Sequence, residues 1–136
     1  MNILETIEEL SNQGYDRIHA EARLCQDIVI QALAKSSVSR NVTIKGGVVM
    51  RSISNDTRRA TRDLDIDFIK YSLEDESINR FVEKINCLAG VKIVRVGNIE
   101  ELRQQDYRGK RVHIRIEDEY GKTLHTFKVR NFLYPL

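Results

Sequence analysis

Cysteine is scarce in this sequence, and long apolar runs are absent. Of 136 residues only Cys25 and Cys87 are cysteines, and no spacing typical of a zinc site occurs. Each lies on an apolar face of a predicted helix, so we expect two reduced core thiols. No segment has the length of a membrane span, and the first residues lack the basic and apolar regions of a targeting signal. We therefore expect a cytoplasmic protein with no membrane partner.

A large excess of charge of one sign is also absent. The formal net charge is +2, with 31% charged and 41% hydrophobic residues. This composition predicts one soluble globular domain, residues 1–136, with its own core. Basic residues outnumber acidic ones in residues 40–70 and 101–136. This excess of positive charge either attracts phosphate groups or belongs to ordinary solvent-exposed faces. The charge therefore does not decide for or against a nucleic-acid partner.

Several common catalytic and metal-binding motifs are not found either. The glycine pair at residues 46–47 is not followed by Gly-Lys-Ser/Thr, which excludes a P-loop. No set of nucleophile, base and orienting group stands out among the Ser, Cys and His residues. Glu117-Asp118-Glu119 lacks the ligand spacing of a calcium loop, and we expect it in a hairpin turn.

Hydrophobic periodicity predicts helices that alternate with short strands. The expected helices are residues 3–12, 16–34, 48–53 and 72–88, the last opened by a capping box at Ser72-Leu73-Glu74-Asp75. The expected strands are residues 41–44, 62–69, 91–96, 111–117 and 124–129, with the last two joined as a hairpin. This order predicts an α/β or α+β domain, a small mixed β-sheet flanked by helices.

One predicted strand, residues 62–69, is unusually acidic. Successive side chains of a strand point to opposite faces, so Asp63, Asp65 and Asp67 are expected to share one face. Carboxylates so close together repel each other unless a cation lies among them, and Mg²⁺ prefers oxygen ligands. The alternative is an exposed edge strand with its charges toward water. Because of the motif upstream, we favour the metal site.

That upstream motif is Lys45-Gly46-Gly47, at the junction of a short strand and a predicted short helix. A glycine pair lets the backbone approach a phosphate closely, and the free N–H groups of the helix would face it. A phosphate cradle beside a metal held by carboxylates is suited to transfer from a nucleoside triphosphate.

The two motifs in this order resemble the polymerase-beta-like nucleotidyltransferase superfamily. The finer pattern closely resembles the AbiEii/AbiGii-type nucleotidyltransferase toxins. It consists of Ile44-Lys45-Gly46-Gly47, then Arg51, then Arg59-Ala60-Thr61-Arg62-Asp63-Leu64-Asp65. A later stretch, Tyr107-Arg108-Gly109-Lys110-Arg111-Val112, is similar to a Tyr-x-Gly-x-Arg-Val segment of that family.

The resemblance implies a nucleotidyltransferase-like fold and the transfer of a nucleoside monophosphate from an NTP to an acceptor. The acceptor would be an RNA such as tRNA, or a protein, and many such toxins are encoded beside a cognate antitoxin. Asp63 and Asp65 would be catalytic and hold Mg²⁺ or Mn²⁺, with Asp67 as a further metal ligand. The nucleotide-binding residues implied by the motif are Lys45, Gly46, Gly47, Arg51, Arg59 and Arg62.

The family pattern also includes a third carboxylate on a later strand, within a hydrophobic-Asp-hydrophobic triplet. The corresponding triplet here is Phe127-Lys128-Val129, in which a lysine would compete with a metal ion. Alternatively, the preceding strand could be the catalytic one. Its corresponding triplet, Ile114-Arg115-Ile116, again has a basic residue in the middle. Glu117 would lie on the wrong face of that strand unless a bulge intervenes. Asp67 is then a substitute for the third acid.

Two alternatives to an active enzyme remain open at this point. In the first, the chain keeps the fold and the nucleotide pocket but is catalytically silent and binds a nucleotide or a partner protein. In the second, it is a piece of a longer toxin, since the C-terminal region of the family is lacking.

Overall fold

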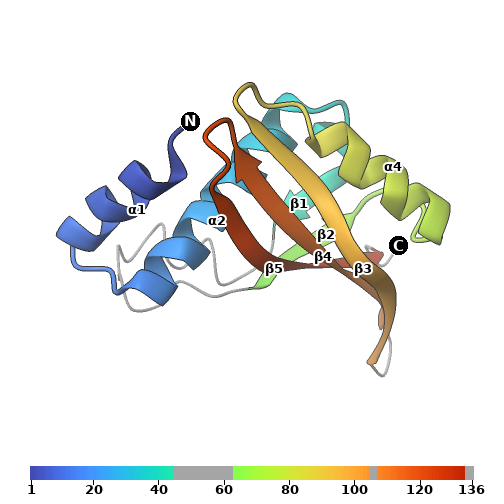
Figure 1. Cartoon of the computed structure of the whole chain (residues 1–136). Helices are drawn as coiled ribbons and strands as arrows, with labels where there is room; N and C mark the ends of the chain where they lie inside the picture. Colours follow the sequence, from blue (N-terminus) through green and yellow to red (C-terminus); the bar gives the residue numbers. More distant parts are fainter. Residues whose placement is uncertain (45–62, 105–106, 134–136) are drawn as a thin grey trace.

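The computed structural model describes residues 1–44, 63–104 and 107–133 (Figure 1). In chain order the elements are α1 (Ile3–Asn12), α2 (Arg17–Lys35), the short 3-10 helix η1 (Ser39–Asn41), β1 (Val42–Ile44), β2 (Asp63–Phe68), α4 (Asp75–Ile85), β3 (Val91–Gln104), β4 (Tyr107–Asp118) and β5 (Thr123–Leu133). The predicted mixed α/β architecture is confirmed. The predicted helix at residues 48–53 lies outside the described residues.

The five described strands form one mixed sheet in the order β1-β2-β5-β4-β3. The acidic strand β2 pairs antiparallel with β1 on one side and parallel with β5 on the other. Strand β5 also pairs antiparallel with β4, and β4 pairs antiparallel with β3. The last of the described strands therefore lies in the middle of the sheet, between the acidic strand and the β3–β4 pair.

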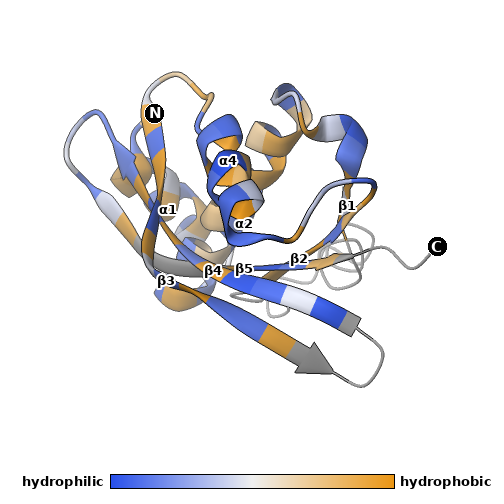
Figure 2. Ribbon diagram, turned by 90° about the vertical axis from the view of Figure 1, so that its right-hand side faces the viewer, coloured by the Kyte–Doolittle hydropathy of each residue, from blue (hydrophilic) through white to orange (hydrophobic). Residues whose placement is uncertain are grey.

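Helices α2 and α4 pack on one face of this sheet, and α1 packs on α2 (Figures 1 and 2). The apolar side chains that fill this layer belong to one core cluster, to which β2, β4 and β5 supply Leu64, Ile66, Phe68, Val112, Ile114, Ile116 and Val129. The opposite face carries no helix among the described elements. Within the described residues no helix is long and apolar enough to cross a membrane.

The two N-terminal helices follow their sequence signals closely. The Asn2 side chain accepts a hydrogen bond from the backbone N–H of Glu5, which caps α1. Asp16 caps α2 through the N–H of His19. Both predicted helices are confirmed, with α2 starting and ending one residue later than expected.

The predicted bounds of the third helix are wrong. Helix α4 begins at Asp75 and ends at Ile85, well inside the predicted residues 72–88. The Ser72 hydroxyl accepts a hydrogen bond from the N–H of Glu74 within a turn, so it caps no helix. Because the helix ends early, Cys87 follows it and is exposed, which corrects its predicted place in the core. Cys25 is buried as expected.

Strand β3 is longer than the predicted residues 91–96. It continues past an irregularity between Val96 and Glu100 and pairs with β4 as far as Gln104. Strand β5 likewise continues beyond the predicted end at residue 129. The pairing of β3, β4 and β5 therefore reaches residues that the hydrophobic alternation alone did not include.

Gly109, in the Tyr-x-Gly-x-Arg-Val segment, allows a close contact between two strands. It lies opposite Phe132 of β5, and a Cβ on Gly109 would come within 2.7 Å of the Phe132 ring. Only glycine leaves room for this ring at that point of the sheet.

Candidate functional site

The acidic strand has one apolar face and one acidic face. Leu64, Ile66 and Phe68 are fully buried against the helices, which confirms the predicted alternation. Asp65 faces the other way with its side chain 29% exposed. Asp67 is buried, only 7% exposed. The side chain of Asp63 lies outside the described residues.

Arg130 of β5 is bound to Asp65. Its Nε donates to Oδ1 of Asp65 at 2.5 Å, and one of its terminal nitrogens donates to Oδ2 at 2.9 Å. The parallel register of β2 and β5 places the two residues directly opposite each other. The same register places the backbone of Lys128 opposite that of Asp63. Two basic residues of β5 are thus aligned with two acidic residues of β2.

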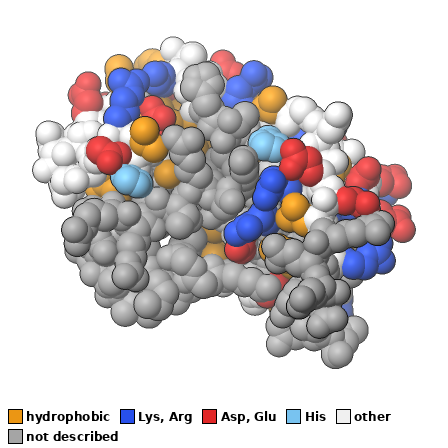
Figure 3. All heavy atoms as spheres, turned by 90° about the horizontal axis from the view of Figure 1, so that it is seen from below, with side chains coloured by type: hydrophobic (Ala, Val, Ile, Leu, Met, Phe, Trp, Pro, Cys, Tyr) orange, Lys and Arg blue, Asp and Glu red, His pale blue; other side chains and the backbone are white. Residues whose placement is uncertain are grey.

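The Asp65–Arg130 pair belongs to a line of charges that crosses four strands. Arg111 of β4 lies opposite Arg130, and Glu100 of β3 lies opposite Arg111. An Nη of Arg111 is 3.3 Å from the Glu100 carboxylate. We call Asp65, Arg130, Arg111 and Glu100 the charged row. Figure 3, a view of the molecule from below, shows basic and acidic side chains next to one another on this side.

His113, next to the charged row on β4, holds Glu100 from a second direction. Its Nε2 is 3.2 Å from the Glu100 carboxylate. This hydrogen bond is the main reason why the pKa of Glu100 lies below its ordinary value, and the nearby charges of His113 and Arg111 add to it. Each arginine of the charged row therefore has a carboxylate from a neighbouring strand.

The described carboxylates do not fit a divalent cation in this arrangement. Both oxygens of Asp65 accept hydrogen bonds from Arg130, whose positive charge would repel a cation at the remaining lone pairs. Among the described residues no group of three His, Cys, Asp or Glu side chains comes together that could hold a metal. The predicted set Asp63, Asp65 and Asp67 stays a prediction, because the Asp63 side chain is outside those residues.

The predicted phosphate-binding residues also lie outside the described part of the chain. They are Lys45, Gly46, Gly47, Arg51, Arg59 and Arg62, and their roles stay predictions. Strand β1 ends at Ile44 and β2 begins at Asp63, and Ile44 pairs with Ile66. The two predicted motifs therefore adjoin the same pair of strands.

Arg130, Arg111 and Glu100 were not predicted to belong to one site. The predicted strand at residues 124–129 stopped one residue before Arg130, and the predicted strand at residues 91–96 stopped before Glu100. The signal for Arg130 was present, since Lys128 and Arg130 alternate with Val129 along the strand. The parallel pairing of β5 with β2 could not be inferred from that pattern.

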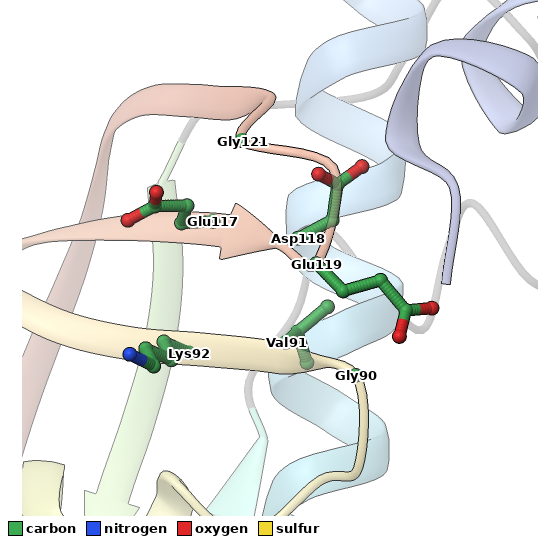
Figure 4. A pocket seen from close by; sticks show the side chains of 7 residues that line it. All are labelled: Gly90, Val91, Lys92, Glu117, Asp118, Glu119 and Gly121. Carbon is green, nitrogen blue, oxygen red and sulfur yellow. The ribbon is translucent and has the colours of Figure 1, made fainter.

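A separate pocket lies where β3 begins and β4 ends (Figure 4). Its volume is about 460 Å³, and it is lined by Gly90, Val91, Lys92, Glu117, Asp118, Glu119 and Gly121. Asp118 accepts hydrogen bonds from the backbone N–H groups of Ile3, Tyr120 and Lys122, each at 2.9 Å. Asp118 thus fastens the hairpin turn and the N-terminus, as expected for a turn, and the pocket shares no residue with the charged row.

The acidic strand lies within a region that matches a known protein family. A model of the family described as "Nucleotidyl transferase AbiEii toxin, Type IV TA system" matches residues 28–129. The chain belongs to this family. The match includes both predicted motifs, Lys45-Gly46-Gly47 and the acidic strand, and it ends one residue before Arg130. The resemblance to the AbiEii toxins inferred from these motifs is therefore confirmed.

No curated protein sequence matches the chain. One similar solved structure is described as a "putative nucleotidyltransferase from H. pylori", with 16% sequence identity and a TM-score of 0.41. The alignment covers 82% of this AbiEii-family chain and 43% of that one, so the chain spans less than half of that protein's length.

Proposed function

We propose that this chain is the nucleotide-binding part of an AbiEii-type nucleotidyltransferase toxin. The observation that carries the proposal is the family match over residues 28–129, which spans both motifs. The reaction is transfer of a nucleoside monophosphate from an NTP to an RNA, such as tRNA, or to a protein acceptor. As in other toxin–antitoxin systems, a cognate antitoxin protein is the expected partner.

In this proposal the motif residues bind the triphosphate. The N–H groups of Gly46 and Gly47 face its oxygens, and Lys45 neutralises part of its charge. Arg51, Arg59 and Arg62 supply further positive charge. Asp63 and Asp65 are the proposed catalytic carboxylates, at the start of β2, where pairing with β5 sets their backbone positions.

A divalent ion, Mg²⁺ or Mn²⁺, is the cofactor that family members of this kind use. When bound, the ion would neutralise part of the negative charge on the transferred phosphoryl group. Because Asp65 is bound to Arg130 in the described arrangement, we assign no step to the ion here.

A second candidate function is a catalytically silent module that binds a nucleotide or a partner protein. It is favoured by the Asp65–Arg130 pair and by the register of Lys128 opposite Asp63, since both bring a basic residue of β5 to the acidic strand. Under this alternative the chain binds an NTP but forms no product.

The test is a titration of each of the four NTPs, with Mg²⁺ present, into the purified chain, followed by thermal unfolding and by incubation with labelled NTP and RNA. A ligand at about 100 times its Kd adds about 2.7 kcal/mol to the free energy of unfolding, which raises the Tm by several degrees. We expect the wild type to show both a Tm shift and labelled product. Both should be lost in Asp63→Asn. The exposed control Glu76→Gln should behave as wild type does.

The outcomes separate the two candidates. Transfer that survives in both Asp63→Asn and Asp65→Asn would show that the acidic strand is not the catalytic centre. A Tm shift without any labelled product favours the silent module. No shift with any NTP would overturn nucleotide binding by this chain.

A further inference from the structure

We propose that Arg130 competes with divalent metal ions for Asp65 and weakens their binding at this residue. Arg130 thus limits access of metal to Asp65, a role that the AbiEii assignment does not give it. The proposal concerns metal affinity and does not require that the chain transfer nucleotides.

The geometry of the pair makes Asp65 a poor ligand for a metal ion. A guanidinium that donates to both oxygens of one carboxylate occupies one lone pair on each, so a metal ion would have to use the remaining lone pairs beside a positive charge. Mg²⁺ binds oxygen at about 2.0–2.1 Å, so an ion on either oxygen would lie against the guanidinium and be repelled by its charge. A metal ion at Asp65 is therefore bound more weakly while Arg130 stays in place.

The pair is set by the sheet and is not a chance contact of two long surface side chains. Asp65 and Arg130 lie opposite each other in the parallel register of β2 and β5, and their side chains are only 29% and 30% exposed. Arg130 is paired on both sides, with Asp65 and with Arg111, and a backbone position fixed in this way lowers the entropy lost when the side chains meet. Partial burial also weakens the competition from water and salt.

The neighbouring charges keep Arg130 in place. Arg111, directly opposite on β4, is bound to Glu100, and His113 holds the same carboxylate. Glu100 therefore neutralises Arg111, which would otherwise repel Arg130 across the β4–β5 pair. From β2 to β3 the charged row therefore consists of an acid, two bases and an acid. Arg130 is paired with Asp65, and Arg111 is paired with Glu100.

The test is direct binding of Mn²⁺ to the whole chain, measured as the loss of the free-ion signal in electron paramagnetic resonance. The variants are wild type, Arg130→Gln, Arg130→Gln/Asp65→Asn and the matched control Arg115→Gln. Arg115 is an exposed arginine of β4, two residues from His113 on the same strand. Its replacement changes the net charge by the same amount as Arg130→Gln.

We expect Arg130→Gln to bind Mn²⁺ at least about tenfold more tightly than wild type, because the competing cation is gone. The gain should disappear in Arg130→Gln/Asp65→Asn, and Arg115→Gln should bind as wild type does. Arg130→Lys serves as a second variant, since a lysine keeps the charge but cannot donate to both oxygens in the same way. It should show a smaller gain.

Equal Mn²⁺ affinity of wild type and Arg130→Gln would overturn the proposal, whether both bind or neither does. A gain that persists in the double variant would also overturn it, because the ion would then lie elsewhere. If Arg130→Gln does not fold, as judged by circular dichroism, the decision rests on Arg130→Lys alone. If Arg130→Lys then binds Mn²⁺ no more tightly than wild type, the proposal is overturned. The experiment contains no NTP, so its failure is distinct from failure of the proposed function.

Discussion

The helix-covered face of the sheet is held by contacts of a different kind from those on its opposite, charged face. Toward the helices, Leu64, Ile66 and Phe68 are fully buried among other apolar side chains, where attraction is non-directional. On the other face, Asp65 and Arg130 interact through two directed hydrogen bonds that depend on strand register. The apolar face therefore stabilises the fold as a whole, whereas the charged face depends on which strands are neighbours.

The largest effect is expected from a cavity on the apolar face. Phe68 packs against the rings of Tyr71 and Phe81, with centroids 5.0 and 5.1 Å away. We expect Phe68→Ala to lower the free energy of unfolding by about 3–5 kcal/mol, measured by urea denaturation. Tyr120→Ala, at a residue that is 69% exposed, is the control and should change it by less than about 0.5 kcal/mol. Similar losses in both variants would contradict the contrast between the faces.

A smaller effect is expected from the pair on the charged face. Removing one partner leaves a partly buried charge without its hydrogen bonds, so Asp65→Asn and Arg130→Gln should each cost about 1–3 kcal/mol. The double variant should lose less than the sum, with a coupling energy of about 1 kcal/mol in a double-mutant cycle. Strict additivity would mean that the two side chains do not interact in solution.

The smallest effect is expected from acid titration of the charged row. The pKa of Glu100 is lowered in the folded state, so its stabilisation is present above its ordinary pKa of 4.5 and is lost as the pH falls through the lower folded value. Wild type should therefore lose more stability than Glu100→Gln does as the pH falls from about 5 to about 3, measured by urea denaturation at each pH. Glu101→Gln controls for the loss of one carboxylate. Parallel pH profiles for wild type and Glu100→Gln would argue against the Glu100–His113 contact.

Much of the fold was predictable because its signals are local. Asn2 and Asp16 are capping residues with their helices directly after them, and the starts of α1 and α2 follow from them. The alternation in β2 predicted its buried face. The start of α4 was not predictable in the same way, because Ser72 bonds to the backbone two residues on and competes with a helix cap.

The candidate site was predictable only in its acidic half. Asp65 stands out in the sequence, but its partner Arg130 is brought to it by parallel pairing of strands that are far apart in the chain. Periodicity tells which residues share a face of one strand, and it carries no information on which strand is adjacent. The phosphate-binding motif was recognised from its residues, and its structure lies outside the described part of the chain.

The position of β5 has a consequence for how the molecule assembles. Without β5, the described strands form two disconnected antiparallel pairs, β1 with β2 and β3 with β4. These pairs join only when β5, the last strand described in the chain, enters between them. Contacts between segments so distant in sequence form late and slow folding. During synthesis, the acidic strand therefore remains without its arginine until Thr123–Leu133 has left the ribosome.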